Sequence, residues 1–179
     1  MPDPADIIAT QSNDAIANAF SSVFVRPGCW RWSFAPSIDS AMVFYPSGVE
    51  VLSVQQFDLL TEFRRARDDT VAFVSTIEQV ETYSEIAEHW ALRFPTYMEY
   101  KDAMIALENA IYGSSGRWGI VLSSEGFGVL GADRVTIRYF RERYRDWAEQ
   151  ERAFRRDFTA ERYSSAAEEI VPSSFTAFD

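Results

Sequence analysis

The chain has 179 residues, of which 47% are apolar, 25% charged and 15% aromatic. This length fits one domain with a sizeable core, and the composition excludes a wholly disordered, collagen-like or coiled-coil chain. The net charge of −10 disfavours nucleic acid and anionic membranes as partners and favours a basic protein. Residues 1–110 hold 16 acidic and 7 basic residues, so most of the negative charge lies there.

The chain has one cysteine, Cys29, and one histidine, His89. A disulfide within the chain and a thiolate or histidine-rich metal site are therefore excluded, and we expect neither a cofactor nor a metal. The N-terminal segment carries acids where a signal peptide needs bases, and no apolar run is long enough to span a membrane. We therefore expect a cytoplasmic protein.

The first part of the chain predicts a helix, a strand and a hairpin. Apolar spacing predicts the helix over residues 4–20, and alternating aromatic residues predict a half-buried strand over 30–34. Pro46-Ser47-Gly48 has the composition of a turn and predicts a hairpin between residues 41–45 and 49–54.

Three segments in the middle of the chain begin with the spacing of a helix capping box. They predict helices over residues 55–67, 77–94 and 97–112, with a short strand over 71–75. Large aromatic residues expected to be mostly buried are Trp30, Trp32, Trp90 and Tyr100.

The C-terminal third predicts a second hairpin, formed by residues 118–122 and 127–130, after a loop at 113–116. Asp133 then has the position of an N-cap for a long helix over 133–158. Because residues 133–140 also alternate like a strand, the start of that helix stays open.

Together these elements predict a single α+β domain over residues 1–163, followed by a loosely docked tail over 164–179. The expected sheet is antiparallel or mixed, and is built from two hairpins and a short central strand. Four to five helices are expected to pack on it.

The predicted helix 77–94 carries an acidic face. Four glutamates repeat there at helical spacing without interleaved Lys or Arg: Glu78, Glu81, Glu85 and Glu88. Such a row slightly destabilises a helix and suits a basic partner, although a plain solvated face would have the same pattern. We predict these four residues as the partner-binding site.

Glu85 and His89 lie four residues apart, which places them on one face of the same predicted helix. A mixed metal site would need ligands from a second such segment, and the sequence has none, so a local ion pair is the favoured interpretation. The adjacent acids Asp68-Asp69 and Glu168-Glu169 are expected to be solvated turn residues.

The predicted helix 133–158 carries a row of arginines beside aromatic residues: Arg134, Arg138, Arg141, Arg145, Arg152 and Arg156. Such a row can grip phosphates. It can equally belong to an amphipathic helix whose arginine stems cover the edge of the core, and the acidity of the chain favours that structural role.

Residues 117–131 (Arg-Trp-Gly-Ile-Val-Leu-Ser-Ser-Glu-Gly-Phe-Gly-Val-Leu-Gly) resemble a pattern in small bacterial toxin-immunity-type proteins. In that pattern, a Trp-Gly strand, a Ser-x-Glu turn and a strand that ends in Leu-Gly lead into a helix. The resemblance implies a cytosolic, non-catalytic protein that binds and blocks a cognate toxin. It assigns no role to a particular residue.

The sequence therefore predicts a non-catalytic protein-binding protein, most concretely an immunity-type inhibitor of a basic bacterial toxin. The alternative is a regulatory or anti-defence factor that mimics nucleic acid with its acids or contacts phosphates with its arginine row. A structural assembly protein and an enzyme with a carboxylate-based site are further alternatives. The sequence does not indicate an oligomeric state.

Overall fold

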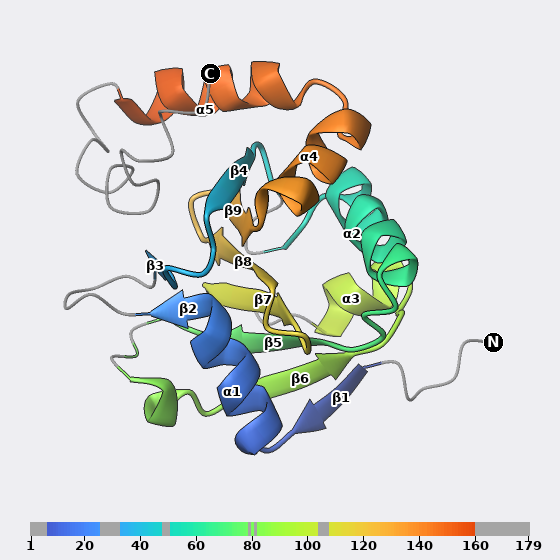
Figure 1. The fold of residues 1–179 in the computed structure, drawn as a ribbon, viewed down its shortest axis with the longest axis vertical. Coiled ribbons are helices and arrows are strands. Elements are labelled where there is room, and N and C mark those ends of the chain that lie inside the picture. The colour runs from blue at the N-terminus through green and yellow to red at the C-terminus, as the bar shows by residue number, and fades with distance from the viewer. Residues whose placement is uncertain are drawn as a thin grey trace.

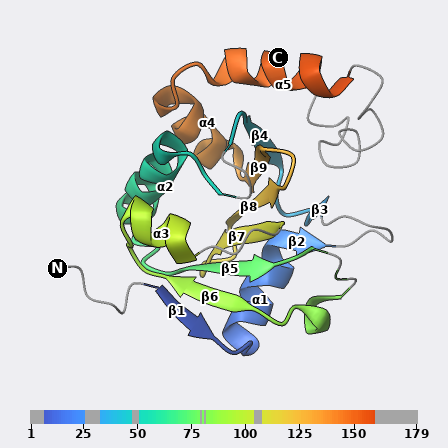
Figure 2. The same ribbon diagram turned by 180° about the vertical axis from the view of Figure 1, so that it is seen from behind.

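The structure is a computed structural model of the chain. It describes residues 7–25, 33–47, 51–78, 80, 82–103 and 108–159. These residues form an α+β fold, in which helices pack on both faces of an antiparallel sheet (Figures 1 and 2).

Seven strands form the main sheet in the order β1-β6-β5-β7-β8-β9-β4, and every neighbouring pair is antiparallel. Their bounds, in chain order, are β1 Ile7–Thr10, β4 Ser40–Phe44, β5 Ala72–Thr76, β6 His89–Leu92, β7 Asn109–Gly113, β8 Trp118–Ser123 and β9 Phe127–Ala132. A separate two-stranded ribbon pairs β2 (Phe24–Val25) with β3 (Ser33–Phe34).

The described helices are α1 Asp14–Val23, α2 Val54–Ala66, α3 Tyr97–Ala103, α4 Arg134–Arg143 and α5 Trp147–Thr159, with a 3-10 helix at Tyr83–Glu85. The apolar side chains of α2, α3 and α4 pack against one face of the sheet. Helix α1 packs against the other face, where it crosses the strands in Figure 1.

Alternation along the strands builds the two cores. In β7, Ile111 points to the α2 side while its neighbours Ala110 and Tyr112 point to the α1 side. In β9, Leu130 belongs to the α2 side, and Val129 packs in a smaller cluster with Phe154 of α5. A strand buried on both faces shows no apolar-polar alternation in its sequence.

Several predicted elements are confirmed. Helix α2 begins at the predicted capping box, in which Ser53 and Gln56 bond reciprocally. Strand β5 and the β8–β9 hairpin lie within a residue or two of the predicted ranges. Asp133 is the N-cap of α4, which makes residues 134–143 helical rather than extended.

The first predicted hairpin is wrong. Strand β4 does occupy residues 40–44, but it pairs with β9, where Met42 lies opposite Leu130. On the other side of the turn, Val54 begins α2, while residues 48–50 lie outside the described part of the chain. The turn therefore leads from a strand into a helix.

The predicted helix 77–94 is also wrong. This segment forms a turn, the 3-10 helix Tyr83–Glu85 and then strand β6. Strand β6 pairs with β1 on one side and with β5 on the other. Pairing on both sides satisfies its backbone polar groups and outweighs the local helical spacing.

Three further helix predictions change in extent. Residues 7–10 of the expected helix 4–20 form β1, and Asn13 caps a later helix, α1. The expected helix 97–112 ends as α3 at Ala103, and residues 109–113 form β7. The expected helix 133–158 breaks into α4 and α5 around Asp146, whose φ is 63°.

Tyr100 is fully buried, as expected, whereas Trp90 is only partly buried. Trp30 and Trp32, most of the first predicted strand and the tail 164–179 lie outside the described residues. No described helix is long and apolar enough to cross a membrane.

Candidate functional site

The two ends of the main sheet differ in charge. At one end, strands β1, β4, β5 and β8 finish while β6, β7 and β9 begin. The connecting segments there, 11–14, 77–88, 108 and 124–126, contain no Lys, Arg or His. Their described acids form what is here called the acidic end: Asp14, Glu78, Glu85, Glu88, Glu108 and Glu125.

Hydrogen bonds tie these segments together. The hydroxyls of Ser12 and Tyr83 lie 2.7 Å apart and join the start of α1 to the 3-10 helix, which lies at the lower left of Figure 1. The backbone N–H of Ile77 donates to the carbonyl of Glu108 over 2.9 Å. The Glu108 carboxylate in turn accepts a bond from Ser123 over 3.1 Å. The acidic end is thus a connected surface.

Three of the four predicted partner-binding glutamates belong to this surface, but not to a helix face. Glu78 is half-buried, and Glu85 and Glu88 are exposed. The Glu85 carboxylate accepts a bond from the Thr82 backbone and caps the 3-10 helix. Glu81 lies outside the described residues.

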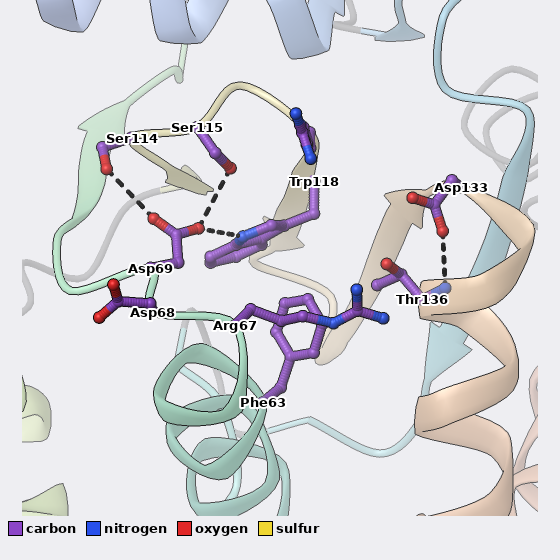
Figure 3. A pocket seen from close by; sticks show the side chains of 10 residues that line it. Phe63, Arg67, Asp68, Asp69, Ser114, Ser115, Trp118, Asp133 and Thr136 are labelled. Atoms are coloured by element: carbon purple, nitrogen blue, oxygen red, sulfur yellow. Dashed lines mark hydrogen bonds between the residues drawn. The ribbon is translucent and has the colours of Figure 1, made fainter.

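The opposite end of the sheet holds a cavity of about 340 Å³ between the end of α2, the β7–β8 turn and the start of α4 (Figure 3). Its walls combine two aromatic rings with charged and hydroxyl side chains. The lining residues are Phe63, Arg67, Asp68, Asp69, Ser114, Ser115, Arg117, Trp118, Asp133 and Thr136.

Asp69 organises one wall of this cavity. Its carboxylate accepts three side-chain hydrogen bonds, from Ser114 over 3.1 Å, Ser115 over 3.2 Å and the Trp118 indole over 2.7 Å. The residue is 7% exposed, so the prediction that it is a solvated turn residue is wrong. The adjacent Asp68 is exposed and has a φ of 53°, as its place in the turn requires.

Gly113 allows this carboxylate and the indole to meet. A Cβ atom at Gly113 would lie 2.3 Å from both Asp69 Oδ2 and Trp118 Nε1, far inside van der Waals contact. The Gly-Ser-Ser-Gly segment at 113–116 is predicted only as a loop. It supplies the space for this contact and two of the hydroxyl groups that donate to Asp69. Its approach to Asp69 is a long-range contact that no local pattern indicates.

Two arginines in the cavity are exposed and form no salt bridge with the described residues: Arg67 and Arg117. Arg67 extends past the Phe63 ring, with its guanidinium carbon 5.9 Å from the ring centroid (Figure 3). Asp133 is already engaged, since its carboxylate accepts from the Thr136 backbone N–H over 2.7 Å. The cavity thus places two guanidinium groups and three carboxylates beside an aromatic wall.

The predicted arginine row is split between α4 and α5, and its members have different roles. Arg134 lies 3.8 Å from Asp39, and Arg156 lies 3.2 Å from Asp157. Arg141 stacks 4.5 Å above the ring of Trp147. The other members, Arg138, Arg145 and Arg152, are exposed.

His89 lies in the core rather than on a surface. Its Nδ1 is 2.8 Å from the Ser75 hydroxyl, which is also 2.8 Å from the Tyr112 hydroxyl. Burial lowers the pKa of the imidazole, and a contact with the Ile86 backbone opposes this effect. Burial raises the pKa of Tyr112 above its ordinary value. These three side chains form a buried polar chain under α1.

No group of three or more His, Cys, Asp or Glu side chains that could hold a metal ion occurs among the described residues. Comparisons of the chain with protein-family models, with curated proteins and with solved structures gave no match. The two candidate binding sites among the described residues are therefore the acidic end and the cavity.

Proposed function

We propose that the chain is a non-catalytic protein that binds a basic protein partner through the acidic end of its sheet. The most concrete form of this proposal is an immunity-type inhibitor that neutralises a bacterial toxin. The observation that carries it is the gathering of six acids at one end of the sheet, five on connecting segments and Asp14 at the start of α1, with no base in the segments named above. A surface of one sign steers an oppositely charged partner and accelerates its capture.

The position of these acids supports a contact surface. Most of them lie on segments that connect the strands of the sheet, where binding residues concentrate in many proteins. Like charges gathered in this way repel one another, and this repulsion by itself lowers stability. A toxin that cuts nucleic acid must be basic where the phosphate backbone binds, so an acidic surface can occupy that cleft.

The resemblance of residues 117–131 to toxin-immunity-type proteins agrees with this proposal. Its turn, residues 124–126, contributes Glu125 to the acidic end. The turn of the resembling hairpin therefore belongs to the acidic end, although the resemblance itself assigns no contact residue.

The proposal is tested by co-expressing the chain in bacteria with each product encoded beside its gene. A toxic neighbour whose lethality is relieved, and which binds the purified chain at a rate that falls steeply as salt rises, supports it. If no neighbouring product is both toxic and bound, the immunity-type function is wrong.

A matched pair of triple variants locates the contact. The first changes Glu78, Glu88 and Glu125 to Gln, since no side-chain bond holds them in the described structure. The control neutralises three exposed acids on α2, α4 and α5: Asp58, Glu142 and Glu149. Both variants alter the net charge equally, so they differ only in where the charge is removed. If the acidic end is the contact surface, only the first should lower the association rate, by about tenfold at low salt. Equal effects would show that net charge alone matters.

A further inference from the structure

The cavity at the other end of the sheet has features of a second, independent binding site. Its volume of about 340 Å³ lies at the low end of cavities that take small organic ligands. It shares no residue with the acidic end. Some of its polar lining groups already form hydrogen bonds within the protein, and others do not. The second kind are the candidates to bind a ligand.

Most carboxylates and hydroxyls of the cavity are already used. The Asp69 carboxylate holds three donors, and the hydrogens of Ser114 and Ser115 point to it. Asp133 caps α4, which removes the helix N-terminus as an anion site. What remains is the pair of guanidinium groups, the carboxylate of Asp68 and the hydroxyl of Thr136. The donors bonded to Asp69 and Asp133 are uncharged, so they do not balance these two carboxylates.

Arg67 and Arg117 reach the cavity from different elements, the end of α2 and the β7–β8 turn. Neither forms a salt bridge with any residue that the structure describes. Guanidinium groups bind carboxylate and phosphate oxygens with paired, charge-assisted hydrogen bonds. Both residues line this one small cavity, so their guanidinium groups are the candidates to bind a single oxyanion.

The rest of the wall indicates the body of the ligand. Phe63 and Trp118 line the cavity, and their rings lie at 86° to each other with centroids 6.0 Å apart. Figure 3 shows Phe63 behind the Arg67 side chain and Trp118 beside the Asp69 carboxylate. An apolar or aromatic body would contact Phe63 while its charged group lies between the arginines.

The Asp69 network keeps this wall in place. It joins the turn after α2 to the β7–β8 turn, and it fixes the ring of Trp118, the residue next to Arg117. Binding sites gain affinity when their walls are ordered before the ligand arrives. We propose that the cavity binds a small organic oxyanion, an aryl phosphate or aryl carboxylate, between Arg67 and Arg117.

Phenyl phosphate, benzoate, inorganic phosphate and benzylamine are the probes. Binding is measured by calorimetry and by the NMR shift of the Trp118 indole N–H, which reports on this cavity because that group bonds to Asp69. Phenyl phosphate or benzoate should shift the signal saturably and bind more tightly than inorganic phosphate. The tighter of the two identifies the oxyanion, and benzylamine should not bind.

Single variants assign the contacts. Arg67→Gln and Arg117→Gln should each weaken binding of the tighter aryl probe by about tenfold or more. The control, Arg138→Gln, removes one exposed charge from α4 outside the cavity and should leave binding unchanged. Asp68→Asn should strengthen binding, because it removes a nearby negative charge and Asn tolerates the left-handed φ of 53°.

Several results would overturn the proposal. These are the absence of a saturable shift, retained binding in the Arg67→Gln, Arg117→Gln double variant, and an equal loss in Arg138→Gln. A single-stranded oligonucleotide that displaces the probe with a multi-phosphate salt dependence would instead assign the surface to nucleic acid. None of these outcomes depends on the acidic end, so they leave the proposed function unaffected.

Discussion

The indole Nε1 of Trp118 donates to Oδ2 of Asp69 over 2.7 Å and joins two residues that lie 49 positions apart. Both residues are buried, at 2% and 7% exposure. The bond connects the turn after α2 to the start of β8, and its two partners form one wall of the cavity. A single contact therefore contributes to both stability and the shape of the proposed site.

Replacing Asp69 with Ala should destabilise the fold by about 2–4 kcal/mol, because it leaves the buried indole without an acceptor. Trp118→Phe removes the same bond from the other side and also leaves a gap in the core. Because the two changes share one bond, the double variant should lose about 1–2 kcal/mol less than the sum of the single losses. Urea unfolding of the four proteins measures this, and strict additivity would contradict the bond.

Gly113→Ala should destabilise the fold by about 2 kcal/mol or more, since its methyl group would overlap the Asp69–Trp118 bond. The neighbouring change Ser114→Ala is the control. It removes one hydroxyl donor from an exposed residue and should cost about 1 kcal/mol or less. Thermal unfolding compares the two, and a Gly113→Ala protein as stable as the control would refute the close approach.

Local signals predicted the elements whose causes are local. The α2 capping box, the Asp133 N-cap and the β8–β9 hairpin each depend on residues within a few positions of one another. The turn composition at residues 46–48 predicts a hairpin, because local composition does not show that β4 pairs with β9. Partner choice between distant strands is a tertiary effect.

The error at residues 77–94 has the same origin. Glutamates at three- and four-residue spacing fit a helix, but they fit equally a loop followed by a four-residue strand. The candidate site shows this limit most clearly. Asp69 has the local pattern of a solvated turn, and only its three distant donors make it a buried organising residue.

Arg64 provides a third test, because it is 2% exposed and donates to backbone carbonyls rather than to a carboxylate. Its partners are Asp69, Thr70 and Leu92, at 3.3, 2.9 and 2.8 Å. Burial lowers the pKa of its guanidinium to about 10, which leaves it charged at neutral pH. The side chain therefore fastens the end of α2 to β6.

Arg64→Met should destabilise the fold by about 3 kcal/mol, because it leaves three backbone carbonyls without their donor. Arg65→Met is a matched control, because Arg65 is exposed and both guanidinium groups lie over the Phe94 ring, at 4.8 Å from its centroid for Arg64 and 5.1 Å for Arg65. Its loss should cost less than about 1 kcal/mol. Urea unfolding midpoints distinguish the two, and equal losses would show that stacking rather than carbonyl bonding is what matters.

His89 makes stability depend on pH in a predictable direction. Its pKa in the folded protein is lowered from 6.5 by burial, so the unfolded chain takes up a proton at a higher pH than the folded one. Well above pH 6.5 both states are neutral, and the imidazole does not change the free energy of unfolding. As the pH falls through 6.5, protonation favours the unfolded state, and stability is lost until the pH lies below the folded pKa.

The measurement is urea unfolding at pH 7.5 and 5.5, a window above the ordinary range of carboxylates. His89→Gln, which keeps a polar side chain near Ser75, should be less stable than the wild type at pH 7.5 but should lose less on acidification. Because His89 is the single histidine, its imidazole signal in NMR titrates without overlap. A midpoint at or above 6.5 in the folded protein would contradict the buried position of the ring, and with it the polar chain from Ser75 to Tyr112.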